Sequence, residues 1–203
     1  MRAVAGILLA AGESRRMGFP KPLLRFPDGQ TFVDRISRAM LSALPHLVVV
    51  VGAHSERVRD AIAKDQRITI VENRDWERGQ LSSIKCALRT VDAKFDAAVI
   101  HLIDHPSVTP STFAAVRDAW NARRTPIVVA RHNGRRGHPV LFDRSLFDEL
   151  LDAPEDRGAR VVVNAEPSRV SYVDVDDPGV TLDLDTPEDL ARAGFPPAPA
   201  QDN

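Results

Sequence analysis

Short apolar runs alternate with helically spaced apolar residues along the first two thirds of the chain, and this alternation limits the possible folds. Apolar residues recur with helical spacing at 32–43, 58–62 and 81–91, and Thr109-Pro110 is a typical helix start. Runs typical of buried strands lie between these segments, at 4–9, 47–51, 68–71, 97–102 and 127–130. Alternating strand and helix units predict an α/β fold with three layers, in which helices flank both faces of a mostly parallel sheet.

The composition is that of a globular chain without a strong charge bias. Of its 203 residues, 43% are hydrophobic and 27% are charged, and the formal net charge is -1. This balance predicts no general attraction to nucleic acid or to an anionic membrane, so any anion site must be local. No stretch approaches the roughly 20 apolar residues that span a bilayer. Cys86 is the single cysteine, which excludes an internal disulfide and favours a cytoplasmic location.

The segment after the first predicted strand combines glycines with cations. It contains Gly12, Arg15, Arg16, Gly18 and Lys21. Backbone amides freed of side chains, with cations beside them, suit a triphosphate. The spacing is neither the GxGxxG of dinucleotide-binding folds nor the GxxxxGK[ST] of P-loops. We predict a different phosphate-wrapping loop, in which Lys21 neutralises phosphate as a point charge and Arg16 donates two hydrogen bonds to phosphate oxygens. Arg15 either joins them or is solvated.

Three carboxylates lie where a cation beside those phosphates would find ligands. Asp104 follows the buried run at 97–102, and Asp183 and Asp185 belong to the segment 182–187, Leu-Asp-Leu-Asp-Thr-Pro. Mg2+ prefers hard oxygen ligands, usually one or two carboxylates with phosphate oxygens and water. Asp104 and Asp185 also suit turns or caps, and Asp183 shares a face with Asp185 if the segment is extended.

Histidines near these carboxylates raise further hypotheses. His101 and His105 flank Asp104, but a zinc site with this spacing and no cysteine is weakly indicated, and Mg2+ is preferred. His138, in Gly137-His138-Pro139, either places an imidazole at the substrate or belongs to an unliganded His-Pro turn.

Small residues open the helix predicted at 81–91. Gly79, Ser82 and Ser83 would let a flat ring lie close to the backbone, or the serines only cap the helix. Trp76 either stacks on a ring or, as is commoner for this residue type, is buried in the core. Cys86 lies among apolar helix positions and is predicted to be a buried, inert thiol.

Together these segments resemble the nucleotidyltransferases that attach a nucleotide to the molybdenum cofactor, most closely the cytidylyltransferase branch. They follow the family order and cover nearly the whole chain. The first is shared by many nucleotide-sugar transferases, whereas Gly-His-Pro and Asp-x-Asp-Thr-Pro are narrower. The matching segments are Leu9-Ala10-Ala11-Gly12, Ser14-Arg15-Arg16-Met17-Gly18, Pro20-Lys21, Asn73, Trp76, Gly79, Ser82-Ser83-Ile84, Asp104-His105-Pro106, Gly137-His138-Pro139-Val140-Leu141-Phe142 and Asp183-Leu184-Asp185-Thr186-Pro187-Glu188-Asp189-Leu190.

The resemblance implies a Rossmann-like nucleotidyltransferase fold and transfer of CMP from CTP to molybdopterin, with release of pyrophosphate. It implies that Arg16, Lys21 and Asp104 are catalytic, that Asp104 and Asp185 hold Mg2+, and that His138 faces the pterin. A molybdoenzyme is the implied protein partner. Ala-Ala-Gly, in place of Ala-Gly-Gly, is similar to the pyrimidine-using branch and favours CTP over GTP. The implied nucleotide-binding residues are Leu9, Ala10, Ala11, Gly12, Lys21, Gly79, Ser82 and Ser83.

This function also predicts how the chain is organised. Residues 1–195 are expected to form a single NTP-transferase domain, with a nucleotide-binding part at about 1–130 and a substrate-side part at about 131–195. The proline-rich segment 196–203 is expected to be a flexible tail.

Two residues depart from the family pattern. Members usually carry glycine immediately before the metal-binding aspartate and Met or Gln after it, whereas this chain has Ile103 and His105. A β-branched side chain at position 103 has the bulk to crowd the ribose and displace the metal, so other functions on the same fold stay open. The alternatives are an NAD(P)H-dependent oxidoreductase acting on an aromatic pigment or quinone-like substrate, a non-catalytic molybdenum cofactor-binding protein, and transfer to a sugar phosphate or other small phosphate. The family contains a divergent member associated with NAD(P)H-dependent reduction of a nicotine-derived pigment, although the missing dinucleotide fingerprint argues against that reading.

Overall fold

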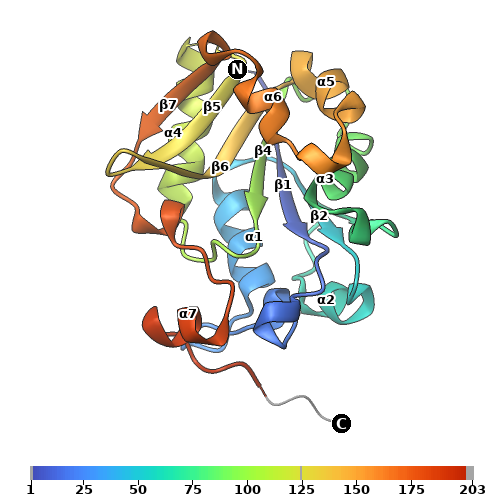
Figure 1. The fold of residues 1–203 in the computed structure, drawn as a ribbon, viewed down its shortest axis with the longest axis vertical. Helices are drawn as coiled ribbons and strands as arrows, with labels where there is room; N and C mark the ends of the chain where they lie inside the picture. Colours follow the sequence, from blue (N-terminus) through green and yellow to red (C-terminus); the bar gives the residue numbers. More distant parts are fainter. Residues whose placement is uncertain (1, 124, 200–203) are drawn as a thin grey trace.

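A seven-stranded sheet with the order β3-β2-β1-β4-β6-β5-β7 forms the centre of the molecule (Figure 1), as seen in a computed structural model that describes residues 2–123 and 125–199. Its strands are β1 (Val4–Ala10), β2 (Leu47–Val51), β3 (Ile68–Glu72), β4 (Ala97–Leu102), β5 (Ile127–His132), β6 (Arg135–Asp143) and β7 (Val170–Asp174). The α-helices are α1 (Phe32–Ala43), α2 (Ser55–Ala61), α3 (Gln80–Leu88), α4 (Pro110–Arg123), α5 (Phe147–Asp152), α6 (Arg160–Ala165) and α7 (Pro187–Arg192). The five strands predicted in the first two thirds of the chain are confirmed. Helix ends are less well predicted, since α3 stops three residues before 91.

Each face of the sheet has its own apolar core. Successive strand residues point to opposite faces, so Val4 and Leu8 of β1 pack with α1 and α4, whereas Ile7 and Leu9 pack with α3 and α5. All seven residues of β1 are buried, as expected for a central strand covered on both faces. The predicted three-layer α/β architecture is therefore confirmed.

The strand order reverses at β1, because β2 and β3 lie on one side of it and β4 lies on the other. This strand pairs in parallel with β2 on one side and with β4 on the other. The arrows of β1 and β4 run side by side in Figure 1 and end at the same edge. In open α/β sheets, ligands bind outside the carboxyl ends of the strands at such a switch point. The loops that follow β1 and β4 are thus placed where a ligand is expected.

The antiparallel member of this mostly parallel sheet is β6, which pairs with β4 and β5. Asn133 and Gly134 join β5 to β6 with positive φ angles of 49° and 77°. Positive φ at both central residues is typical of the type I′ turn of a tight hairpin. Because β7 then pairs in parallel with β5, the segments after residue 131 extend the same sheet.

The last helix begins at the predicted start. Thr186 accepts from the Asp189 backbone amide while the Asp189 carboxylate accepts from Thr186, which forms a capping box for α7. The described part of the expected tail, 196–199, contains no helix or strand, and 200–203 lie outside the described residues. No helix within residues 2–123 and 125–199 is long and apolar enough to cross a membrane.

Candidate active site

The loop after β1 is held in one shape by its own contacts. Ser14 and Gly18 adopt positive φ angles of 63° and 68°, and a single 3-10 turn lies between them. The Lys21 backbone amide donates to the Ser14 hydroxyl at 3.0 Å. Met17 and Phe19 are buried in the core on the α1 side of the sheet. These anchors fix the direction in which the Lys21 side chain leaves the loop.

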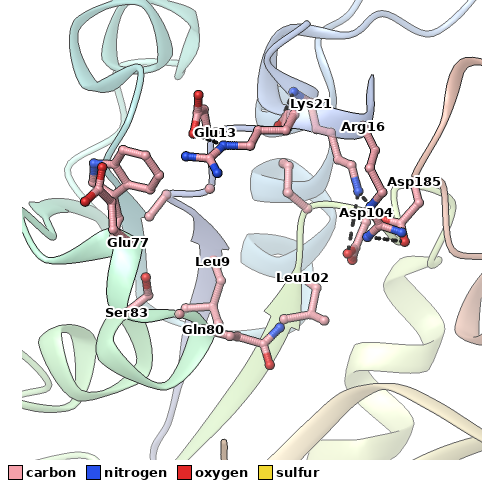
Figure 2. A pocket seen from close by; sticks show the side chains of 17 residues that line it. Leu9, Glu13, Arg16, Lys21, Glu77, Gln80, Ser83, Leu102, Asp104 and Asp185 are labelled. Carbon is pink, nitrogen blue, oxygen red and sulfur yellow. Dashed lines mark hydrogen bonds and ion pairs between the residues drawn. The ribbon is translucent and has the colours of Figure 1, made fainter. Parts of the chain in front are cut away.

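Cations of this loop meet carboxylates from two distant segments. Lys21 Nζ lies 2.5 Å from Asp185 Oδ1 and 3.9 Å from Asp104 Oδ2, and Arg16 Nη2 lies 2.7 Å from Asp185 Oδ2. Figure 2 shows these four side chains gathered at one end of a cavity. The Lys21 side chain is only 10% exposed, whereas that of Arg16 is 71% exposed. The structure thus brings together the four side chains that the sequence picked out for phosphate and metal binding.

Local hydrogen bonds hold the two carboxylates in place. The Leu184 amide donates to the Asp104 carbonyl oxygen at 2.9 Å, and this bond ties the two carboxylate-bearing segments together. The Asp185 amide donates to the Asp189 carboxylate at the start of α7. Burial alone would raise the pKa of Asp185, but the hydrogen bond from Lys21 and the charges of Lys21 and Arg16 outweigh it and hold the pKa below its usual value. Asp185 is therefore ionised at neutral pH.

The cavity itself has a volume of about 680 Å³ and extends from these charges to the start of α3. Gly79 opens α3 with a φ of +98°, a conformation that favours glycine. Ile103, the departure from the family pattern, lines the cavity and also packs against the α1-side core. Of the residues predicted to bind nucleotide, those that line the cavity are Leu9, Ala11, Gly12, Lys21, Gly79 and Ser83.

Two predicted nucleotide-binding residues point elsewhere. The Ala10 side chain packs into the α1-side core. The Ser82 hydroxyl donates to the Gly79 carbonyl and accepts from the Asn73 side-chain amide, so it stabilises the turn before α3. Trp76 is half-buried and lines the cavity, which differs from the fully buried core position predicted as the commoner case. One part of its ring is therefore available to a ligand.

A second cavity of about 750 Å³ adjoins the first and shares Gln80, Leu102 and Asp104 with it. Its apolar lining comes from β4, β5 and β6, including Ile100 and Val140. Sequence reasoning missed the cations of this cavity because they lie in polar, turn-rich segments, and their clustering around Gly137 and Gly158 is the signal that was available. These cations are Arg135, Arg136, Arg157 and Arg160.

His138 lies in this second cavity, within β6 rather than in a turn. Burial, followed by the neighbouring His105, lowers its pKa to about 3, so the imidazole is neutral. The preceding Gly137 is required by space, because a Cβ there would lie 1.8 Å from the Val180 carbonyl oxygen. The Gly-His-Pro segment thus lets β6 pass directly beneath the chain that leads to Asp183 and Asp185.

The histidines beside Asp104 occupy different environments. His101 is completely buried, and its Nε2 donates to the His105 carbonyl oxygen at 3.0 Å. Burial holds the His101 pKa well below its usual value, so this ring is neutral and stabilises the loop after β4 through its hydrogen bond to His105. His105, Asp104 and Asp183 each place a ligand atom within 4.8 Å of the others, and Asp185 is not part of that group.

The lone cysteine lies away from both cavities. Cys86 is half-buried on α3, and its thiol donates to the Glu72 carbonyl oxygen at 3.6 Å. Burial raises the pKa of the thiol, which keeps it protonated and weakly nucleophilic.

Comparisons with known proteins identify similar chains. The profile of the family described as MobA-like NTP transferase domain matches residues 6–170. A molybdenum cofactor cytidylyltransferase from Escherichia coli (strain K12) is 27% identical over 95% of this chain and 96% of its own. A nicotine blue oxidoreductase from Paenarthrobacter nicotinovorans is 31% identical over 93% of this chain and 95% of its own. The crystal structure of Rv0371c from Mycobacterium tuberculosis H37Rv is similar with a TM-score of 0.81 and 33% identity, covering 94% and 96% of the two chains, and a complex of Rv0371c with manganese is also similar.

Proposed function

The chain belongs to the MobA-like NTP transferase domain family, and on this premise we propose that it transfers CMP from CTP to molybdopterin and releases pyrophosphate. The observation that carries the proposal is the meeting of Lys21, Asp104 and Asp185 at the carboxyl edge of β1 and β4. This group closes one end of a cavity large enough for a nucleotide, and Asp104 also borders the second cavity. Two adjoining cavities with one shared carboxylate suit a reaction that joins two substrates.

Lys21 and Arg16 are proposed to bind the triphosphate. In the structure both cations are paired with Asp185, which keeps their charges directed into the cavity. A triphosphate would offer them several anionic oxygens in place of one carboxylate. Lys21, nearly buried, interacts with such charges more strongly than a solvated cation does, because little water lies between them. We therefore assign Lys21 the larger part in neutralising the departing pyrophosphate.

The carboxylates fit a divalent cation that accompanies the triphosphate. Asp104 Oδ2 lies 3.9 Å from Lys21 Nζ, on the side of the first cavity, so it offers an oxygen ligand there. Asp185 would provide a second oxygen once its cations have turned to the phosphates. We propose Mg2+ for this role, since it prefers such hard oxygen ligands. When bound, the ion would add positive charge beside the phosphate oxygens.

The second cavity is proposed to hold the pterin-bearing acceptor. Its apolar strand surface suits a flat ring system, and its arginines suit a terminal phosphate. Neutral His138 can donate or accept a hydrogen bond there without charge repulsion. A phosphate oxygen of the acceptor would attack the α-phosphorus of CTP, the bond from that phosphorus to the β-phosphate oxygen would break, and pyrophosphate would leave. The acceptor phosphate is already anionic at neutral pH, so no strong general base is needed.

The base is proposed to lie at the end of the first cavity opposite the charges. Figure 2 shows Leu9, Ser83 and Gln80 at that end. Ala11 is 3% exposed and lines the cavity, so its methyl group narrows the space beside the nucleotide. A narrower site favours a pyrimidine over a purine, which supports CTP. Gly79 and Ser83 would face the base or the ribose.

The remaining assignments follow from this function. We propose a cytoplasmic enzyme that passes its product to a molybdoenzyme. We also propose that residues 1–195 act as one domain, with about 1–130 binding the nucleotide, about 131–195 binding the acceptor, and 196–203 serving as a flexible tail.

The test is pyrophosphate release by the purified protein with molybdopterin and either CTP or GTP, each with and without Mg2+. The proposal expects release with CTP that depends on both the acceptor and the cation. Thermal shift with CTP, GTP, ATP and NADPH provides an independent binding measurement, because a ligand that binds only the folded state raises Tm. A shift with NADPH alone, together with oxidation of NADPH by an aromatic acceptor, would replace the proposal with the oxidoreductase reading. Binding of molybdopterin without pyrophosphate release from any nucleotide would replace it with a non-catalytic carrier.

A further inference from the structure

The two carboxylate oxygens of Asp104 face different surroundings. Oδ2 lies 3.9 Å from Lys21 Nζ, on the side of the first cavity. Oδ1 lies 3.9 Å from His105 Nε2, on the side of the second cavity. This distance is too long for a hydrogen bond, and Oδ1 is buried without a partner among the described residues. A buried carboxylate oxygen left unpaired is costly, so a cation on the second side of Asp104 would stabilise it.

His105 is buried beside this oxygen and is itself unsatisfied. Its side chain is 10% exposed, and within the described ranges its Nδ1 has no hydrogen-bond partner. The loop position of His105 is fixed, because its carbonyl oxygen accepts from the fully buried His101 ring. An imidazole held in place next to a carboxylate, with no hydrogen bond to satisfy it, is available as a metal ligand.

Asp183 supplies the third ligand. Its carboxylate and the ligand atoms of Asp104 and His105 all lie within 4.8 Å of one another. A cation with bonds of about 2.1 Å separates opposite ligands by about 4.2 Å, so a small side-chain rotation suffices to close the group around an ion. Asp183 lines the second cavity from an exposed position, which gives an ion a path of entry.

We propose that Asp104, His105 and Asp183 bind a first-row transition-metal ion such as Mn2+ or Co2+ at the second cavity, in addition to the Mg2+ that accompanies the triphosphate. The nitrogen ligand is the reason for this choice of metal. Mg2+ prefers a shell of oxygen atoms and gains little from imidazole, whereas transition-metal ions bind mixed imidazole and carboxylate sets well. The site goes beyond the proposed transfer reaction and adds a positive charge beside Asp104 to those of the arginines in the acceptor cavity, so that an anionic acceptor oxygen could bind there.

The test measures metal binding directly, without nucleotide. The full chain is freed of metal with a chelator and titrated with Co2+, and binding is followed by the visible ligand-field absorption of Co2+ and by calorimetry. Parallel titrations with Mn2+ and Mg2+ give the order of affinity. We expect one site per chain that binds Co2+ and Mn2+ more tightly than Mg2+. Loss of an outer-shell partner typically lowers metal affinity about 10–100-fold, so loss of a ligand in His105→Gln or Asp183→Asn should cost at least that much.

Matched controls exist on the same chain. His132→Gln removes an imidazole that donates to the Val175 carbonyl oxygen instead, and Asp176→Asn removes an exposed carboxylate close to Asp183 in sequence. Neither control should alter the Co2+ spectrum. Thermal melting of the His105→Gln and Asp183→Asn proteins shows whether they remain folded, and both should melt within a few degrees of the parent.

The inference is overturned if the folded parent shows no saturable Co2+ band, if both ligand variants bind Co2+ as the parent does, or if Mg2+ binds as tightly as Co2+. Its fate is separate from that of the proposed function, because pyrophosphate release is measured independently with Mg2+. A protein that binds Co2+ through His105 but releases no pyrophosphate from CTP would retain this site and lose the transferase assignment.

Discussion

Replacement of Lys21 by glutamine tests how much of the proposed catalysis depends on one nearly buried cation. The Lys21 ammonium lies 2.5 Å from Asp185 and 3.9 Å from Asp104, with a side chain only 10% exposed. Two unit charges about 4 Å apart interact by about 4 kcal/mol in such partly buried surroundings, but by about 1 kcal/mol in bulk water. Arg16 contacts the same carboxylate from a side chain that is 71% exposed, so it belongs to the weaker, solvent-screened case.

These interaction energies predict that loss of Lys21 lowers kcat more than loss of Arg16. Part of the Lys21 interaction is already present with bound substrate, and removal of one directed donor to developing charge commonly costs about 2.7–4 kcal/mol in the transition state. We therefore expect Lys21→Gln to lower kcat by about 10²–10³-fold. Arg16→Gln should lower it by about 5-fold, which corresponds to about 1 kcal/mol.

The assay is steady-state pyrophosphate release from CTP with acceptor and Mg2+, accompanied by a melting curve for each variant. Lys94→Gln is the matched control, because Lys94 is an exposed lysine that pairs with Asp92 away from the cavity. A Lys21→Gln protein that turns over within threefold of the parent, or an Arg16→Gln protein that is the more damaged of the two, would refute the reasoning from burial.

Three further predictions test the surroundings of the site. Gly137→Ala should lower the free energy of unfolding in urea by about 2–4 kcal/mol, because the added Cβ would lie 1.8 Å from the Val180 carbonyl oxygen. Gly12→Ala adds a Cβ with no atom within 4 Å, so this variant should keep its stability and lose affinity for CTP. Asp177→Ala should lower the free energy of unfolding by about 3 kcal/mol at pH 7, since the buried carboxylate accepts from Thr109, Thr112 and the Gly179 amide. Those bonds outweigh burial and hold the Asp177 pKa below its ordinary 3.8. The loss of unfolding free energy in Asp177→Ala should therefore be complete above pH 3.8 and shrink as the pH falls below that value. A loss that stays constant down to about pH 2 would contradict the assignment. Ala11→Gly should widen the nucleotide cavity and raise the rate with GTP relative to CTP in the pyrophosphate assay, and an unchanged ratio would remove Ala11 from base selection.

The fold was largely predictable from the sequence because its strands are short, apolar and covered on both faces. The run 47–51, for example, coincides with β2, since a short continuous apolar segment rich in valine has few alternatives. The direction of β6 was not predicted. Asn133-Gly134 is a strong hairpin signal, but the surrounding charged residues made 132–137 resemble a surface loop. β6 consequently joins the sheet as the antiparallel strand next to β4.

The site was predictable where a loop follows a strand and less so where side-chain direction depends on distant packing. Lys21 and Asp185 are 164 positions apart, and only the shared carboxyl edge of the sheet made their meeting foreseeable. Ser82 and Ser83 are adjacent on α3, and the Asn73 side-chain amide donates to both hydroxyls, at 2.8 and 3.0 Å, an arrangement that spacing in the sequence could not reveal. Residues 182–185 do not form a regular strand. The alternation of side chains along a strand therefore could not predict that Asp183 lies beside Asp104 and His105.

Asp183 and Asp185 lie on different sides of Asp104, and each carboxylate has a separate part in the proposed site. Asp185 is bound by two cations of the phosphate loop, so its negative charge is already compensated on the nucleotide side. Among the described residues Asp183 has no such ion pair, and it lies instead in a group with Asp104 and His105 on the acceptor side. An anionic acceptor must approach an anionic triphosphate, and their repulsion is reduced only if positive charge is present on both sides of the reacting phosphorus. Lys21 provides it on one side. On the other side an ion at His105 would add to the charge of the arginines in the second cavity, at the place where the described residues leave Asp104 Oδ1 unpaired.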